Sequence, residues 1–208
     1  MKAARAGAIA LAAALAVSCS AAENGQRGGE PERQLVAATV AGDAAKVRQL
    51  LDSGADPNKM APHEGHDQSP WKLVLHQARQ NRPELTEIVR AMLAAHANPG
   101  VAWGEARSRR GTNLFTVQPT TPILEAVSNA ATDVVRALME AGLDVRHGEL
   151  ALVLAVENGQ SDIAHVLVDA GVDVNSHRSA NTPLVAAIEA RNVPLMTYLE
   201  DHGAREKP

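Results

Sequence analysis

Apolar residues recur along the chain at the spacing of one helix face, and the pattern returns at intervals of about thirty residues. Spacing of the i, i+3, i+4 kind is typical of a helix that buries one side. Clear examples are Val47, Leu50 and Leu51; Val134, Val135 and Leu138; and Ile163, Val166 and Leu167. The pattern therefore predicts a series of short amphipathic helices.

Five segments also end in the same way, with an apolar pair followed by a turn similar to Gly-Ala-Asp. These endings lie at residues 50–56, 92–98, 138–144, 167–173 and 199–204. Three segments begin alike, with Ser69-Pro70, Thr121-Pro122 and Thr182-Pro183, and the last two prolines each lie 20 residues before a closing Gly. In the second segment Pro70 lies 26 residues before His96, so six residues are inserted there, which we place around residues 80–84.

The residue types at these positions explain how each segment folds. A hydroxyl residue before Pro marks a helix start, because the hydroxyl caps free N–H groups and Pro at the first helical position loses no hydrogen bond. Gly42 and Gly159 end the first helix of their segments, since Gly adopts the left-handed conformation without steric penalty. Small residues that let neighbouring helices approach closely follow the Pro position by four: Ala38, Ala126, Ala155 and Ala187.

This combination resembles the ankyrin repeat. The family's Thr-Pro-Leu opening with a central Ala is present at Thr182-Pro183-Leu184 with Ala187, and its closing motif is present at residues 50–56 followed by Asn58. The resemblance implies an all-α solenoid of about five helix-turn-helix repeats with two long inter-repeat loops over residues 33–205. The expected repeats are 33–59, 68–99, 120–147, 149–176 and 181–205.

Some positions depart from the family pattern. No repeat has His after the Thr-Pro-Leu position, Arg191 replaces the Gly after the last first helix, and His96 replaces the closing Gly of the second repeat. We expect the second repeat to be the least regular. Each repeat buries its apolar face only against its neighbours, so the end repeats need polar outer surfaces.

The N-terminus reads as an export signal over residues 1–18. Lys2 and Arg5 precede an uncharged stretch at residues 6–17, whose helical length of about 18 Å is too short for a hydrocarbon core of about 30 Å. Two cleavage sites compete: after Ala22, or before Cys19 in a sequence that resembles the bacterial lipobox. We favour lipidation of Cys19, since the single Cys of the chain lies where it would be modified.

Residues 19–32 are polar and rich in Gly, and we expect them to form a flexible tether. By resemblance to Gram-negative lipoproteins, Ser20 favours the outer membrane over retention at the inner membrane. The expected location is therefore the periplasm, with an N-terminal lipid anchor as the only contact with a membrane.

Composition and charge exclude several classes of function. The chain is 45% hydrophobic but only 2% aromatic, which suits a core of small aliphatic residues between helices. A net charge of -4 gives no general attraction to nucleic acid, and one Cys excludes an internal disulfide and a zinc site with several Cys ligands. We expect a monomer that uses no cofactor and binds no nucleic acid.

No motif in the sequence indicates a catalytic site. The chain has neither a Gly-rich phosphate loop nor a Gly-x-Ser-x-Gly elbow. The best enzyme-like string is residues 63–67, where His63, Glu64 and His66, with His76 and His96 possible neighbours, could share a metal. The spacing differs from that of zinc hydrolases, so a solvated loop is the favoured interpretation and a metal-assisted hydrolase the alternative.

Two long connections, at residues 57–69 and 99–120, are more informative, because connections beyond about 12 to 15 residues are usually functional or disordered. The second combines aromatic and Arg residues, which dominate binding hot spots: Trp103, Arg107, Arg109, Arg110 and Phe115. We predict a projection that contacts a partner. The alternative is that the two rings pin the loop to the repeats.

The resemblance implies a second contact surface, on the concave face of the stack. Ankyrin proteins bind with their finger tips and with the exposed ends of the first helices. The matching positions are Val40, His76, Gln77, Ser128, Asn129, Glu157, Asn158, Glu189 and Ala190.

The favoured function is a non-enzymatic binding module for a periplasmic protein partner, either a toxin or an envelope protein. Bacterial proteins similar to this chain include immunity proteins, which would act by occluding a toxin's active cleft with the projection. They also include periplasmic proteins that support peroxide protection alongside catalase. A passive scaffold in an envelope complex is a further alternative.

Overall fold

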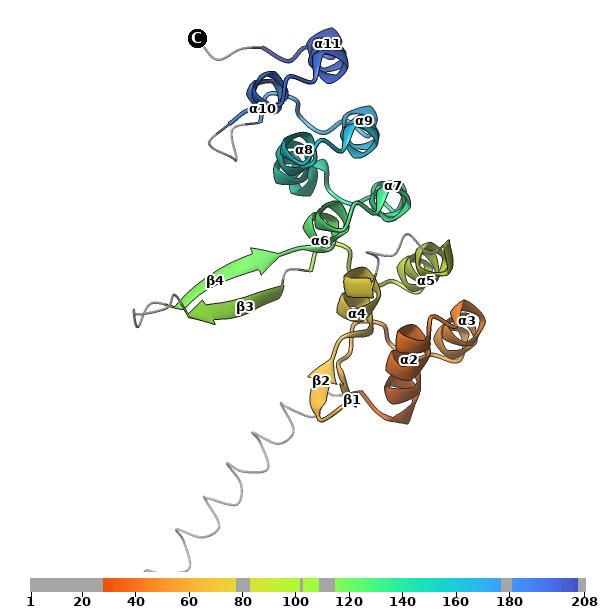
Figure 1. Ribbon diagram of the computed structural model, residues 1–208. Coiled ribbons are helices and arrows are strands. Elements are labelled where there is room, and N and C mark those ends of the chain that lie inside the picture. Colours follow the sequence, from red (N-terminus) through yellow and green to blue (C-terminus); the bar gives the residue numbers. More distant parts are fainter. Residues whose placement is uncertain (1–27, 78–82, 102, 109–114, 177–180, 206–208) are drawn as a thin grey trace, which may run out of the picture.

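Pairs of short helices are stacked in the computed structural model, which describes residues 28–77, 83–101, 103–108, 115–176 and 181–205 (Figure 1). The pairs are α2 (Glu30–Ala41) with α3 (Ala44–Asp52), α4 (Pro70–Gln77) with α5 (Pro83–Ala94), α6 (Pro122–Ser128) with α7 (Thr132–Glu140), α8 (Gly148–Glu157) with α9 (Ser161–Asp169), and α10 (Pro183–Glu189) with α11 (Val193–Asp201). A single 3-10 turn, Val145–His147, precedes α8 in this part of the chain. The predicted all-α ankyrin-type solenoid of five repeats is confirmed.

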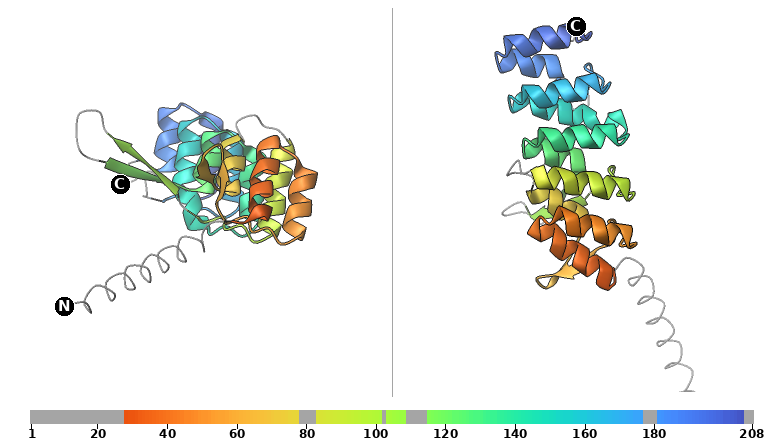
Figure 2. Two further views of the ribbon diagram at one scale, coloured as in Figure 1. Left: turned by 90° about the horizontal axis from the view of Figure 1, so that it is seen from below. Right: turned by 90° about the vertical axis from the view of Figure 1, so that its right-hand side faces the viewer.

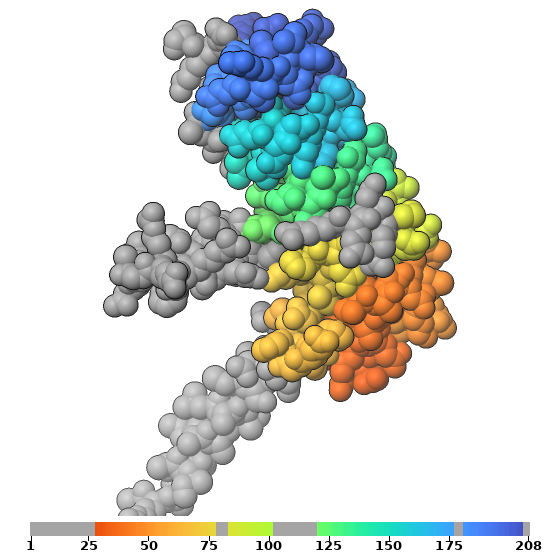
Figure 3. Space-filling model, viewed as in Figure 1, coloured from red at the N-terminus to blue at the C-terminus, as the bar shows by residue number. Residues whose placement is uncertain are grey.

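Figure 2 shows the pairs as successive layers, and Figure 3 shows their surfaces following one another in chain order. The small residues predicted for the first helices lie at the centre of this packing: Ala126, Ala155 and Ala187 are fully buried and Ala38 is nearly so. Trp71 fills the place that Ile123 and Leu184 take in other repeats. Because each layer contacts only the next, stability is distributed along the stack.

Both turns of a repeat use the left-handed backbone conformation. After the first helix, φ is 72° at Gly42, 54° at Ala130, 71° at Gly159 and 53° at Arg191. After the second helix, φ is 94° at Gly54, 63° at His96, 82° at Gly142, 89° at Gly171 and 88° at Gly203. The helix packing therefore imposes this conformation even where the sequence supplies His, Arg or Ala.

The second repeat differs from the others, as predicted. Its second helix α5 has 12 residues, whereas α3, α7, α9 and α11 have nine each. Pro83 and Glu84, which we placed in the insertion, form the first turn of α5. The rest of that insertion falls at residues 78–82, outside the described residues.

The two long connections, predicted as loops, each contain an antiparallel β-hairpin. Strands β1 (Ala61–His63) and β2 (His66–Gln68) flank a two-residue turn with positive φ at Glu64 and Gly65. Strands β3 (Trp103–Ser108) and β4 (Phe115–Thr120) form a longer ribbon. Three-residue strands are too short to show a period of two, and this explains why the first hairpin was missed.

Side-chain amides join neighbouring repeats at the closing turns. The Asn58 amide donates to the carbonyl of His96 at 3.1 Å and accepts from the Asn98 N–H at 2.8 Å. Asn175 makes the same pair of bonds to the fifth repeat, donating to Gly203 O at 2.9 Å and accepting from Arg205 N–H at 2.9 Å. Each Asn therefore satisfies backbone groups that belong to the following repeat.

The first helix begins at Glu30, so the folded part of the chain starts before residue 33 and includes the last residues of the predicted tether. Glu32 is buried, with its carboxylate accepting from Gly29 N–H at 2.6 Å and from Asp56 N–H at 3.2 Å. Gly28 N–H donates to Met60 O at 2.7 Å. These bonds order the backbone that composition alone marked as flexible.

The predicted signal segment and Cys19 lie outside the described residues. Within the described ranges, no helix is both long enough and apolar enough to span a bilayer.

Candidate protein-binding surface

The β3–β4 ribbon carries three of the predicted contact residues. Trp103 pairs with Thr120 at the end next to α6, Arg107 pairs with Thr116, and Phe115 pairs with Ser108 at the far end. Figures 1 and 2 show the ribbon leaving the stack beside α6 and extending away from the helices. Trp103 and Phe115 thus lie at opposite ends of the ribbon.

The other two predicted ribbon residues, Arg109 and Arg110, lie outside the described residues. The side chains of the strand residues also lie outside the description. The ribbon is therefore defined here by its backbone pairing and its place on the stack.

A second group of predicted residues forms one row on the first helices. His76, Ser128, Glu157 and Glu189 each lie six residues after the Pro position of their repeat, and all four are exposed. Their exposure leaves them accessible to a partner, and the contact itself stays a prediction. We call these four residues the first-helix row.

Asn129 follows Ser128 along the chain, but its environment differs from the predicted one. Only 8% of Asn129 is exposed, and its amide donates to the Leu75 carbonyl at 2.9 Å in the preceding repeat. The same amide lies 3.5 Å from Glu125 Oε1, which is also 3.4 Å from His76 Nδ1. Asn129 therefore joins two repeats, and the prediction that it offers an exposed contact is corrected.

The remaining residues predicted on the first helices differ in their exposure. Gln77 is half-buried, with an Oε1 atom that finds no hydrogen-bond partner among the described residues. Asn158 is exposed, and Glu189 is exposed while accepting from the Asn181 amide at 3.2 Å. The exposed carboxylates of this face thus lie in the fourth and fifth repeats.

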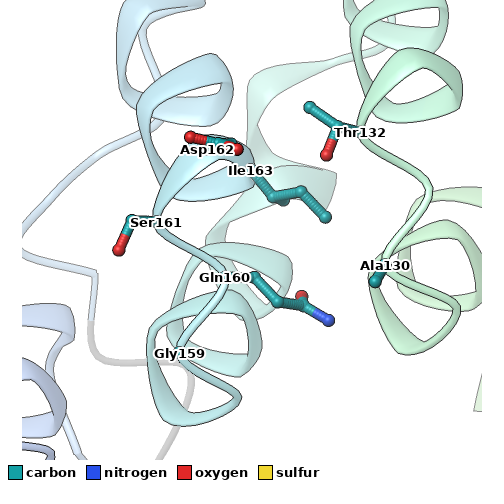
Figure 4. Close-up of a pocket in the computed structure, with 7 residues that line it drawn as sticks. All are labelled: Ala130, Thr132, Gly159, Gln160, Ser161, Asp162 and Ile163. Atoms are coloured by element: carbon teal, nitrogen blue, oxygen red, sulfur yellow. The ribbon is translucent and has the colours of Figure 1, made fainter.

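A polar pocket of about 340 Å³ lies close to this row, between the turn after α6 and the turn after α8 (Figure 4). Gln160 spans the two repeats, donating from Nε2 to Val127 O at 2.9 Å. The lining residues are Ala130, Thr132, Gly159, Gln160, Ser161, Asp162 and Ile163. The pocket can hold a small polar group, but its lining lacks a His or Lys to activate the hydroxyls of Thr132 and Ser161.

The candidate metal string forms the tip of the first hairpin. His63 and His66 are paired across the Glu64-Gly65 turn. His76 and His96, which we considered as neighbours, lie at the ends of α4 and α5, and His76 contacts Glu125 instead. Across the described ranges, no three His, Cys, Asp or Glu residues come together in a way that could hold a metal ion.

The second helices bear exposed ion pairs that the sequence does not predict. Arg48 and Glu87 are 3.4 Å apart, and Arg90 and Glu140 are 3.5 Å apart, each pair joining successive repeats. All four side chains are more than half exposed, so each pair contributes little to stability.

A cluster around Tyr198 was also missed. The Tyr198 hydroxyl donates to Asp169 Oδ1 at 2.6 Å, and its ring centroid is 4.2 Å from those of His165 and His202. Desolvation, followed by the hydrogen bond and the negative charge of Asp169, raises the pKa of Tyr198 to about 12. The four-residue spacing of Tyr198 and His202 on one helix was the available signal, but the contact with His165 depends on how α9 and α11 pack.

Asp144 and Arg146 form a local pair at the closing turn of the third repeat. A side-chain hydrogen bond from Arg146, with a further backbone bond, lowers the pKa of Asp144 to about 2. Arg146 stands where Asn58 and Asn175 stand in their repeats, and it turns back to Asp144. This repeat therefore uses a local pair where the first and fourth repeats use an Asn bridge.

Comparison with known proteins supports the repeat assignment. A model of ankyrin repeats in three copies matches residues 75–178 and, in a second overlapping placement, residues 123–207. Together the two placements cover more than half of the 208 residues. No curated protein matches the chain. The family match and the repeated pairs of helices lead to one conclusion: the chain belongs to the ankyrin-repeat family.

Proposed function

We propose that this protein binds a protein partner in the bacterial periplasm and acts by occlusion rather than by catalysis. Ankyrin repeats are protein–protein interaction modules, and proteins built from them are typically non-enzymatic. The observation that carries the proposal is the β3–β4 ribbon, which extends from the stack beside α6, one of the first helices that bear the exposed row. A stack that carries both elements offers a partner two contact surfaces.

A toxin directed at the periplasm is the partner that we favour. A narrow two-stranded ribbon suits an active cleft, which a flat surface cannot enter. In this account the ribbon blocks access of substrate and the first-helix row holds the rim of the cleft. The protein acts as a monomer and needs no cofactor.

A pull-down from periplasmic extract tests the binding function. The bait is the chain without residues 1–18, and the matched variants are a ribbon deletion, in which a short Gly-Ser linker replaces residues 102–119, and Glu157→Lys in the first-helix row. Arg136→Ala, an exposed change on the second helices, is the control. We expect one stoichiometric partner with the parent and the control, and at least a tenfold loss of affinity with the ribbon deletion, corresponding to about 1.4 kcal/mol or more.

The cellular role needs a separate measurement. Deleting the gene should sensitise cells to a toxin-producing neighbour, and the chain should restore resistance. Sensitivity to peroxide instead, with recovery of a catalase in the pull-down, would support the stress-protection alternative. No partner in any extract would contradict the binding function.

The location and anchor are proposed from the basic start, the apolar stretch and Cys19. Metabolic labelling with a fatty acid should mark the parent chain in the outer-membrane fraction. Cys19→Ser should remove the label while leaving an ordinary signal intact. Equal labelling of both would rule out Cys19 as the acylated residue.

A further inference from the structure

We propose, building on the binding function above, that the partner docks by adding an extended, acidic strand to the outer edge of β3. The ribbon would then become a three-stranded sheet whose third strand belongs to the partner. This assigns a binding mode and a partner chemistry to one element of the molecule.

Backbone hydrogen bonding carries the first step. Six residue pairs, from Trp103 with Thr120 to Ser108 with Phe115, hold β3 and β4 together, and in the described part of the chain neither strand pairs with a third. Alternate residues of each strand therefore present N–H and C=O groups on its outer edge. A two-stranded ribbon is only marginally stable in water, and addition of a third strand satisfies these groups.

The two edges are not equivalent. Pro119 lies within β4 and has no N–H to donate, whereas β3 contains no Pro. A Pro within an edge strand discourages pairing on that strand. The outer edge of β3 is thus the better template.

Strand register separates the residues into two faces. Gly104 with Pro119, Ala106 with Val117, and Ser108 with Phe115 share one face, and the other three pairs share the opposite face. The first face is mainly apolar and ends in the pair Ser108 and Phe115, while the second begins with Trp103 and Thr120 and continues with the polar pairs Glu105 with Gln118 and Arg107 with Thr116. A partner strand that alternates apolar and polar residues would continue both faces.

Charge selects the partner's polar residues. Residues 103–120 contain three arginines, Arg107, Arg109 and Arg110, and one acid, Glu105, in a chain whose net charge is -4. Opposite charges on neighbouring strands stabilise the pair, and like charges directly opposite destabilise it. The polar positions of the added strand are therefore acidic, at least opposite Arg107.

The test uses the full chain without residues 1–18 and a short blocked peptide in which Glu alternates with Val or Thr. Amide hydrogen exchange and NMR titration report binding at individual residues. We expect alternate amides of β3 to gain protection while the amides of β4 do not. A matched peptide with Lys in place of Glu should bind about tenfold more weakly at low salt.

Three variants make the test specific. Ala106→Pro and Arg107→Pro remove neighbouring N–H groups that point to opposite edges, so one of them blocks the outer edge and leaves β3–β4 pairing intact. That variant should lose peptide protection. Arg107→Glu should reverse the preference for the Glu peptide over the Lys peptide, and thermal unfolding should show the stack unchanged in each variant.

Several outcomes would overturn the proposal. These are no protection of β3 at millimolar Glu peptide, protection that survives both Pro variants, and dimerisation of the chain through β3 in sedimentation experiments. If the pull-down still recovers a ribbon-dependent partner in these cases, strand addition fails and the binding function stands. If the peptide binds as expected but no protein partner is found, the binding function fails instead.

Discussion

The helix stack and the β3–β4 ribbon show two ways in which this chain specifies structure. In the stack, one pattern is repeated and every layer is held by the next, so local departures such as His96 and Arg191 still adopt the shared turn geometry. The ribbon occurs once and is held by pairing between its own strands. Repetition therefore makes the stack tolerant of changes in sequence, while the ribbon, our proposed contact with a partner, depends on its own pairing.

The largest expected effect on stability comes from a cavity in the core of the stack. Leu167→Ala removes a fully buried side chain and should reduce the free energy of unfolding by about 2–5 kcal/mol. Denaturant unfolding followed by circular dichroism measures the loss.

Leu150→Ala is the matched control, since Leu150 is 41% exposed, and it should change stability by about 0.5 kcal/mol or less. The ribbon deletion should resemble this control. A loss of stability as large as that of Leu167→Ala would show that the ribbon supports the stack, contrary to the comparison.

The next largest effect concerns the Asn bridges. Asn175→Ala removes both hydrogen bonds to Gly203 O and Arg205 N–H, and because these bonds are exposed the cost should be about 0.5–1.5 kcal/mol. Hydrogen exchange should accelerate in α11 more than in α6. Asn158→Ala, an exposed Asn in the same repeat, should leave exchange unchanged, and equal acceleration in both variants would contradict a specific bridge.

The turn residues should give a smaller effect of opposite sign. His96→Gly and Arg191→Gly relieve a left-handed conformation that L-residues adopt unfavourably, and each should stabilise the chain by up to about 1 kcal/mol.

Gly142→Ala tests the same turn geometry in the other direction. An added Cβ meets nothing within 4 Å there, so only the conformational penalty, again about 1 kcal/mol, should appear. Thermal unfolding of the three variants checks both signs. Stabilisation by Gly142→Ala would refute the shared geometry.

The smallest effect at neutral pH involves Tyr198. Its folded pKa of about 12 lies above the ordinary value of 10.0, so its contribution to stability is fully present below pH 10 and is lost as the pH rises through 12. Tyr198 is the one tyrosine of the chain, and ultraviolet absorbance titration therefore reports it alone. Asp169→Asn should bring the transition closer to pH 10, while an unchanged transition would remove Asp169 as a cause.

The sequence predicted much of the fold that depends on local chemistry, although the Thr121 hydroxyl, expected to cap α6, makes no capping hydrogen bond. Thr182 and Pro183 start α10 as expected, with the Thr182 hydroxyl accepting from Val185 N–H at 3.3 Å, and Gly42 ends α2 in the left-handed conformation. Such signals act within one helix turn and can be read directly from the residues.

What the sequence missed depends on contacts between residues far apart in the chain. Asn129 is a polar residue at a helix end and was therefore expected to be exposed. The neighbouring repeat instead supplies Leu75 O as an acceptor and buries the Asn129 amide. Glu32 likewise looked like part of a charged tether, although Asp56 N–H and Gly29 N–H hold its carboxylate. Interactions between residues 24 or 54 positions apart leave no local pattern.

The bonds of Gly28 and Glu32 have a mechanical consequence. Tension applied through the N-terminal end reaches the Gly28–Met60 hydrogen bond first and the two contacts of the Glu32 carboxylate next. The force is thus transmitted to the backbone at Asp56 and Met60, next to the first hairpin, before α2 can unwind. These hydrogen bonds therefore protect the first helix from a force applied at the N-terminal end.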